Sequence, residues 1–94
     1  MNDLIYALAT PVGGAIAVVR LSGAGADALL HAIFTGRGGP REMVYGRVVD
    51  EAGETLDQAM AAFFPAPRSY TGEDMAELYL HGGQASVRRV LALL

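Results

Sequence analysis

The chain has 94 residues, which is enough for one small domain and too few for two. Its hydrophobic fraction of 52% and charged fraction of 18% favour a globular fold over a disordered chain, and the lack of cysteine excludes disulfides and thiolate chemistry. All seven basic residues are arginines, so the chain lacks the lysine of a nucleotide-binding P-loop, and its net charge of −3 argues against RNA binding by this chain alone.

The first half of the chain is predicted to form two strands and one helix. Residues 5–9 are a short apolar run typical of a strand, and the β-branched run 15–21 predicts a second, central strand. Residues 10–14 supply the turn between the two, with glycines that are able to adopt positive φ. A helix is predicted over 25–34, because apolar residues recur there with helical spacing on one face: Ala26, Leu29, Leu30 and Ile33.

The second half is predicted to form a hairpin, a further strand and a second helix. The hairpin pairs 42–50 with 55–64 across a short connection that contains a glycine. A strand is predicted over 74–80 and a helix from 83 onward. The apolar face of that helix is formed by Val87, Val90, Leu91 and Leu94. Because strands outnumber helices and the first connections are short, we expect an α+β fold with a mixed, largely antiparallel sheet and two helices.

The two ends of the chain lead to further expectations. The N-terminus lacks the basic start of a signal peptide, and no run approaches the ~20 apolar residues of a membrane span, so we expect a cytoplasmic protein with no membrane partner. The last helix stops at Leu94 within its apolar face, without a capping glycine or a polar exit. We therefore expect a single domain over 1–94 that is truncated at its C-terminus.

Three segments of the sequence share a recognisable pattern. In the first segment, residues 9–23, the tripeptide Ala-Thr-Pro precedes the run AIAVVRLSG. In the second, residues 64–74 read FPAPRSYTGED, and in the third Glu77 is followed by HGG at 81–83. In this order and spacing they resemble the amino-terminal domain of the MnmE (TrmE) family of tRNA-modification GTPases. The resemblance covers nearly the whole chain, and its most specific part is SYTGED followed by E-x-x-x-H-G-G.

The resemblance implies both a fold and a function. The fold would be that of the folate-binding domain of aminomethyltransferases. The domain would form a homodimer and bind a tetrahydrofolate derivative, 5-formyl- or 5,10-methylene-tetrahydrofolate, as the one-carbon donor. The parent proteins work with the flavoprotein MnmG and modify carbon 5 of the wobble uridine of certain tRNAs. GTP, magnesium and potassium would bind to a GTPase domain beyond residue 94, and in the family a segment beyond residue 94 also contributes to the folate site.

Arg20 and Glu77 are the two candidate folate-binding residues. Arg20 is the only charge in an apolar strand, where it must bind a partner or ligand, or reach solvent from the end of the strand. Glu77 shares a strand face with Met75 and Tyr79, and its carboxylate could accept hydrogen bonds from the 2-amino group and ring N–H of a reduced pterin. A cross-strand ion pair or a solvent-facing glutamate is the alternative for Glu77.

The resemblance adds weight to both candidates, because the family's folate contacts fall on these positions. Tyr79 is a further candidate, since an aromatic ring beside Glu77 could lie against the pterin. Tyr70 is another, either covering a pocket or capping the sheet. No catalytic residue and no metal-ligand set is predicted anywhere in the chain.

Other polar residues are predicted to have structural roles. The stretch 81–83 resembles an oxyanion-hole sequence, but no G-x-S-x-G elbow accompanies it, so its glycines are expected to turn the chain from strand into helix. Glu73 and Asp74 are expected to shape a loop together with Thr71, through hydrogen bonds to local backbone N–H groups. His31 is expected at the surface.

The first loop departs from the family pattern. Family members usually read T-P-P-G-R-G, whereas residues 10–14 read TPVGG, one residue shorter and without the arginine. This departure supports one alternative function, a dimerisation module that no longer binds folate. A second alternative is a fragment of a stand-alone folate-dependent one-carbon transferase, whose sequence beyond residue 94 would contain no P-loop.

Overall fold

The fold is a single sheet with two helices. The computed structural model describes residues 4–8, 16–69, 71–81 and 83–94. Its elements in chain order are β1 (Ile5–Leu8), β2 (Ala17–Ser22), α1 (Ala26–Ile33), β3 (Val44–Val49), β4 (Thr55–Phe64), β5 (Met75–Leu80) and α2 (Gly83–Leu93). The predicted α+β class and both helices are confirmed, and the bounds of β4 are those expected from the sequence.

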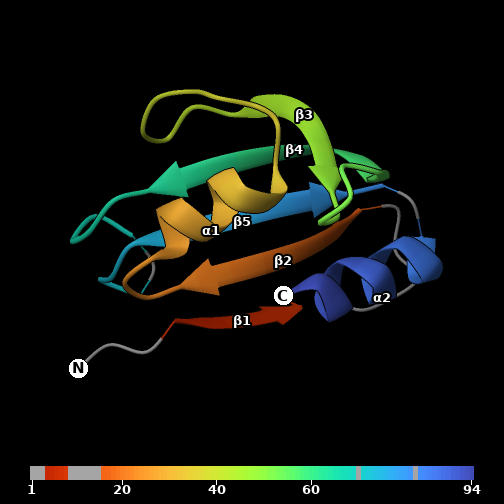
Figure 1. Ribbon diagram of the computed structural model, residues 1–94. Helices are drawn as coiled ribbons and strands as arrows, with labels where there is room; N and C mark the ends of the chain where they lie inside the picture. Colours follow the sequence, from red (N-terminus) through yellow and green to blue (C-terminus); the bar gives the residue numbers. More distant parts are fainter. Residues whose placement is uncertain (1–3, 9–15, 70, 82) are drawn as a thin grey trace.

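The five strands lie in the order β1-β2-β5-β4-β3, so β5 is inserted between β2 and the β3–β4 hairpin (Figure 1). Every pairing among the described strands is antiparallel, which refines the expectation of a mixed, largely antiparallel sheet. The helix α1 links β2 to β3 at the far edge, and it crosses one face of the sheet on the way. As predicted, β2 lies inside the sheet, with β1 on one side and β5 on the other.

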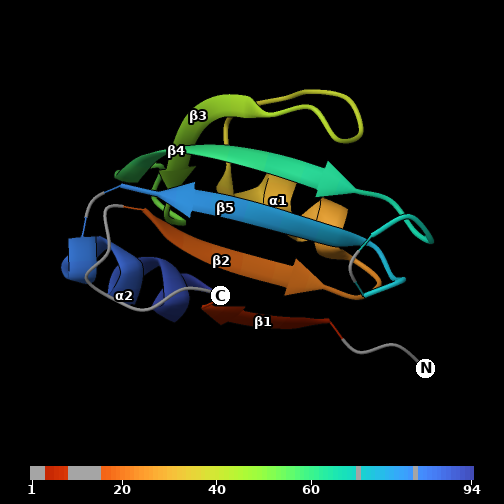
Figure 2. The ribbon, with the colours of Figure 1, turned by 180° about the vertical axis from the view of Figure 1, so that it is seen from behind.

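One face of the sheet carries the hydrophobic core. The pairing registers place Val19 opposite Leu78 and Leu78 opposite Ala61, so these side chains point to the same side. Both helices contribute to the same cluster, α1 through Leu30 and Ile33 and α2 through Val87 and Val90. Seen from behind, the strands β2, β5 and β4 lie in front of α1 (Figure 2). The apolar stripes predicted for the two helices therefore face the sheet.

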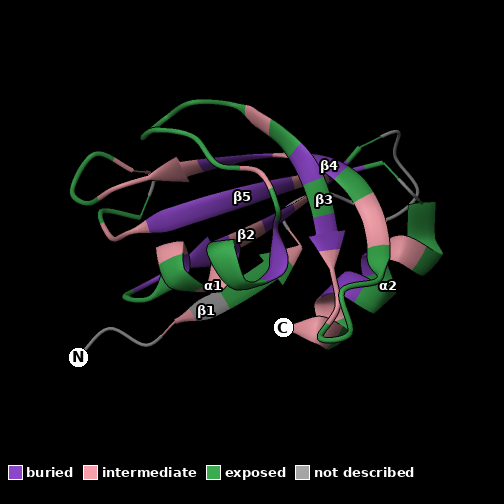
Figure 3. Ribbon diagram, turned by 45° about the horizontal axis from the view of Figure 1, so that its top comes forward, coloured by how far each residue is buried: buried purple, intermediate pink, exposed green. Residues whose placement is uncertain are grey.

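The opposite face of the sheet has no helix among the described residues, and we call it the open face. It carries every second residue of the strands, including Arg20 and Ser22 of β2, Met75 and Glu77 of β5, and Ala62 of β4. Several of these are nonetheless buried: Ser22 is 3% exposed, Ala62 4%, Glu77 7% and Met75 0%. Figure 3 shows β5 as buried over most of its length.

The outer edge of β3 is covered by the segment that follows α1. The Thr35 backbone N–H donates to the Arg47 carbonyl at 2.9 Å, and the Arg47 N–H donates to Thr35 Oγ1 at 2.9 Å. Gly46 lies so close to this segment that a Cβ added to it would come within 2.6 Å of the Gly36 nitrogen. A glycine is therefore strongly favoured at this crossing, because a Cβ would collide with the backbone of Gly36.

The β3–β4 hairpin confirms the clearest prediction from the sequence. Its turn is fixed by Asp50, whose Oδ1 accepts hydrogen bonds from the backbone N–H groups of Ala52 and Glu54, both at 2.9 Å. Gly53 adopts a φ of 83°, a left-handed conformation that favours glycine. Asp50 thus acts as an Asx-type turn residue that sets the register of the hairpin.

Candidate functional site

The centre of the open face brings together the two residues singled out from the sequence. Arg20 on β2 and Glu77 on β5 lie directly opposite each other in the antiparallel register. Their neighbours on the same face include Tyr79, two residues along β5, and Ala62, opposite Glu77 on β4. Because side chains alternate along a strand, this placement follows from the register alone.

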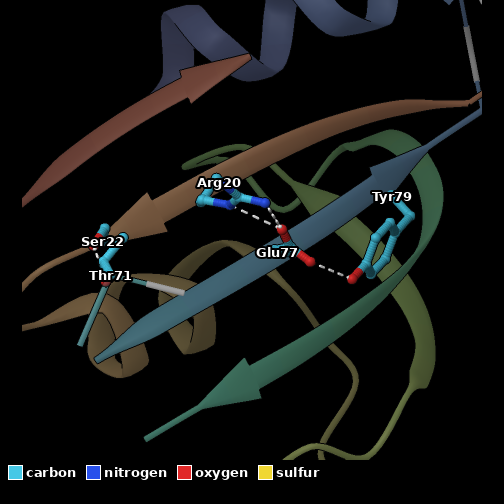
Figure 4. A network of polar contacts seen from close by, with 5 residues as sticks. All are labelled: Arg20, Ser22, Thr71, Glu77 and Tyr79. Atoms are coloured by element: carbon cyan, nitrogen blue, oxygen red, sulfur yellow. Dashed lines mark hydrogen bonds and ion pairs between the residues drawn. The ribbon is translucent and has the colours of Figure 1, made fainter. Parts of the chain in front are cut away.

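Arg20 and Glu77 form an ion pair. The Nε and Nη2 groups of Arg20 donate to Oε2 of Glu77 at 2.9 and 2.6 Å (Figure 4). The Tyr79 hydroxyl donates to the other oxygen, Oε1, at 2.5 Å. A carboxylate offers about four acceptor sites, and described residues donate three hydrogen bonds to this one. The structure thus contains the cross-strand ion pair that was the alternative interpretation of Glu77.

Burial makes this pair unusual for a small domain. Glu77 is the one charged residue in the buried set of the described chain, and its side chain is 9% exposed, against 35% for Arg20. Removing a carboxylate from water costs roughly several kcal/mol unless an opposite charge and hydrogen bonds compensate. Here the Arg20 guanidinium supplies the charge, and both it and the Tyr79 hydroxyl supply hydrogen bonds. The result is an acidic group aimed at an open surface and held in place from two sides.

A loop borders one end of the open face. The Ser22 hydroxyl donates to Thr71 Oγ1 at 2.8 Å (Figure 4). The Gly23 N–H donates to the Asp74 carbonyl at 2.8 Å. Asp74 Oδ1 accepts from the Ala66 N–H at 2.9 Å, and Thr71 Oγ1 accepts from the Glu73 N–H at 3.3 Å. The loop-shaping roles predicted for Thr71 and Asp74 are confirmed. Tyr70 lies outside the described residues.

The stretch after β5 is arranged for turning the chain. The His81 N–H donates to Asp57 Oδ2 at 2.8 Å, and His81 Nδ1 lies 3.3 Å from the Gln58 carbonyl. Gly83 adopts a φ of 80°, as expected for a glycine that begins a helix after a sharp turn. Gly82 lies outside the described residues, as do residues 10–14 of the shortened first loop. His31 is exposed as predicted, with Nδ1 3.3 Å from Asp27 Oδ1.

One cluster gave no signal in the sequence. Arg41 and Arg68 belong to two loops, and the Arg41 guanidinium donates to the Arg68 carbonyl. The two residues are 27 positions apart. They lie beside Phe64 at the end of β4 and line a pocket of about 420 Å³ with it. Loop conformation, which periodicity does not predict, creates this contact.

The described residues contain no group of three or more histidine, aspartate or glutamate side chains suited to a metal ion. Over the same part of the chain, neither helix has the length and apolar character needed to cross a membrane. At Glu77 the carboxylate and the Arg20 guanidinium lie together on the open face.

Comparison with known proteins identifies the family. The family described as "GTP-binding protein TrmE N-terminus" matches residues 4–94. The tRNA modification GTPase MnmE of Roseiflexus sp. is 50% identical over 96% of this chain, and that of Parvibaculum lavamentivorans is 51% identical over 98%. The MnmE of Thermus thermophilus is 48% identical over the whole chain.

The match covers only part of each relative. The chain spans 21% of the Roseiflexus protein, 22% of the Parvibaculum protein and 23% of the Thermus protein. The aligned part corresponds to the family's N-terminal region, in agreement with the resemblance carried by SYTGED and HGG. The chain therefore belongs to the TrmE (MnmE) family, as its N-terminal domain.

Proposed function

We propose that this chain is the tetrahydrofolate-binding and homodimerising domain of a tRNA modification GTPase that acts on carbon 5 of wobble uridine. Membership of the TrmE family supports the parent activity. The observation that carries folate binding is the buried carboxylate of Glu77, held on the open face by Arg20 and Tyr79. A stability role alone does not require an acidic group at this place, since apolar residues of similar volume in place of a buried ion pair are often as stable.

The chemistry of the site fits a reduced pterin. The ring edge of a pterin presents a 2-amino group and an adjacent ring N–H, two parallel donors like the Nε–H and Nη2–H fork that Arg20 now directs at Glu77. Ligand and Arg20 would therefore compete for the same carboxylate. We infer that Arg20 turns toward a ring carbonyl or carboxylate of the ligand when the pterin edge takes its place, and that Tyr79 lies against the ring.

The remaining parts of the proposal concern the parent protein. The parent would form a homodimer, act with the flavoprotein MnmG and tRNA in the cytoplasm, and bind GTP, magnesium and potassium in a separate domain. Exposed large apolar residues give a self-association surface some support: Tyr45 is 61% exposed and Met43 52%. The likeness to the folate-binding domain of aminomethyltransferases is part of the same proposal.

Calorimetric titration with 5-formyl-tetrahydrofolate tests folate binding. We expect saturable heat with the unchanged protein, and its loss in Arg20→Ala and Glu77→Gln variants. Arg88→Ala is the matched control, because Arg88 is an exposed arginine on α2 and its removal should leave binding unchanged. Unfolding in urea should first establish that each variant is folded.

The outcomes separate the proposal from its alternatives. If this chain is folded and dimeric but gives no heat, the same titration on the full-length protein decides the matter: heat there would mean that the segment beyond residue 94 completes the site, and no heat there would mean a dimerisation module without folate binding. If Glu77→Gln bound the ligand as tightly as the unchanged protein, Glu77 would not read the pterin edge, and the assignment of the site would be wrong.

A further inference from the structure

A pocket lined by two arginines lies at the end of the open face. It has a volume of about 420 Å³ and is lined by Arg41, Phe64, Arg68 and Ser69. The backbone of Arg41 is fixed by its N–H, which donates to the Phe63 carbonyl at 2.7 Å, and by a φ of 62°. The Arg41 guanidinium in turn reaches the carbonyl of Arg68. The two loops are thereby joined with both arginines at one pocket.

This pocket shares its face with Glu77. In the β4–β5 register Ala62 lies opposite Glu77, and Phe64 lies opposite Met75. Phe64 therefore lies two residues farther along the same side of the sheet, about 7 Å from Ala62. The loop that carries Arg68 and Ser69 is tied to the end of β2 by the Ser22–Thr71 hydrogen bond. One ligand lying along β4 and β5 would meet both sites.

The lining of the pocket indicates what it binds. Two of its four residues are arginines and none is acidic, in a chain whose net charge is −3. Guanidinium groups favour carboxylates and phosphates, which they bind through charge-assisted hydrogen bonds. Phe64 supplies an aromatic wall beside them. By contrast, a pocket of about 220 Å³ between α1 and the loop before β3 is lined by Asp27 and Glu42, which would repel an anion.

We propose that Arg41 and Arg68 bind the glutamate tail of the ligand whose ring lies against Glu77. The proposal rests on the folate-binding function proposed above. The aromatic ring that separates a folate's pterin from its glutamate would lie along Phe64, and the carboxylates of the tail would lie between the two guanidinium groups. Longer glutamate tails then bind more tightly, because each added residue brings another carboxylate to the arginines.

Three ligands that differ only in the tail test this proposal: 5-formyl-tetrahydropteroate without glutamate, 5-formyl-tetrahydrofolate with one glutamate, and its triglutamate form. For the unchanged protein we expect the dissociation constant to fall by about tenfold or more from the tail-free ligand to the triglutamate. Arg68→Gln should lose most of this discrimination. It retains the Arg68 carbonyl that accepts from Arg41, so the loops stay joined.

The double variant Arg41→Gln/Arg68→Gln should bind all three ligands alike, with the dissociation constant of the tail-free ligand. The double variant Arg88→Gln/Arg89→Gln removes the same charge from exposed positions of α2 and should keep the full discrimination. Equal binding of the three ligands to the unchanged protein, or discrimination that survives in Arg41→Gln/Arg68→Gln, would overturn the tail site while leaving the ring site intact. Failure of all three ligands to bind the full-length protein that contains this chain would overturn the proposed function and the tail site together.

Discussion

At the scale of single residues, Glu77 is a buried charge on the face of the sheet that no described helix covers. Its oxygens accept two hydrogen bonds from Arg20 and one from Tyr79. If Arg20 is lost, the buried Glu77 carboxylate keeps part of its desolvation cost uncompensated. If both Arg20 and Glu77 are replaced by apolar residues, that cost of burying a charge is removed. Stability and ligand binding should therefore respond differently to changes at this pair.

Arg20→Met is expected to lower the free energy of unfolding by about 1–3 kcal/mol, because Glu77 is left with Tyr79 alone. The side chain of Arg20 is 35% exposed, so solvent screening places the loss toward the lower end of this range. The double variant Arg20→Met/Glu77→Leu should recover stability to within about 1 kcal/mol of the unchanged protein. Neither variant should bind 5-formyl-tetrahydrofolate.

Urea unfolding measures the stability of these variants, and calorimetric titration measures their ligand binding. A double variant less stable than Arg20→Met alone would show that the ion pair contributes more than it costs, contrary to the argument above. If the double variant bound folate, neither Arg20 nor Glu77 would belong to the folate site.

At the scale of elements, the segment after α1 and the strand β3 depend on close backbone contact. Gly46 and Gly36 approach each other where residues 34–36 cover the outer edge of β3. Gly39, in the same connection, has open space instead: a Cβ added there meets nothing within 4 Å. Neither glycine has a positive φ, so the two positions can be compared for the space around the added Cβ, although Gly46 lies in β3 and Gly39 in the loop before it.

Gly46→Ala is expected to lower the free energy of unfolding by about 1–3 kcal/mol, because the new methyl group meets the backbone of Gly36 and the ring of Phe34. Gly39→Ala should change it by less than about 1 kcal/mol, in the stabilising direction, by restricting the unfolded chain. Thermal or urea unfolding of the two variants makes the comparison. Equal effects at both positions would mean that the crossing adapts and that this edge of β3 is not tightly packed.

The elements themselves were largely predictable from the sequence. Hydrophobic patterns in the sequence predicted the bounds of β4 as observed, and they predicted both ends of α1 to within one residue. The pairing of Arg20 with Glu77 was not predicted, although both were singled out, because it depends on β5 lying between β2 and β4. Their separation of 57 positions is beyond the reach of local patterns. Arg41 and Arg68 were missed for a related reason, since only loop conformation brings them together.

At the scale of the whole molecule, stability is concentrated on one face of the sheet. The helices and the core residues of β2, β4 and β5 form one cluster there, and Leu78 at its centre is fully buried. The open face holds the ion pair and several exposed or half-buried side chains, among them Tyr45 of β3. The helix-covered face thus provides the hydrophobic core, and the folate site proposed above lies on the opposite side of the sheet.

Leu78→Ala is expected to lower the free energy of unfolding by about 2–5 kcal/mol, because it leaves a cavity among buried neighbours. For a domain of this size the total is about 5–15 kcal/mol, so the melting temperature should fall by on the order of 10 °C or more. Tyr45→Ala, at a side chain that is 61% exposed, should shift the melting temperature far less. A small shift for Leu78→Ala would contradict the assignment of the core to the helix-covered face.

The placement of β5 between β2 and β4 also governs the order in which the chain folds. The β3–β4 hairpin joins residues close in sequence, so it forms early, on a timescale of roughly microseconds for isolated hairpins. The β2–β5 pairing closes a loop of some fifty residues, as in the contact between Arg20 and Glu77, and the entropy of that closure must be lost before the pairing contributes any energy. We therefore expect the β2–β5 pairing, and with it the contact between Arg20 and Glu77, to form after the β3–β4 hairpin.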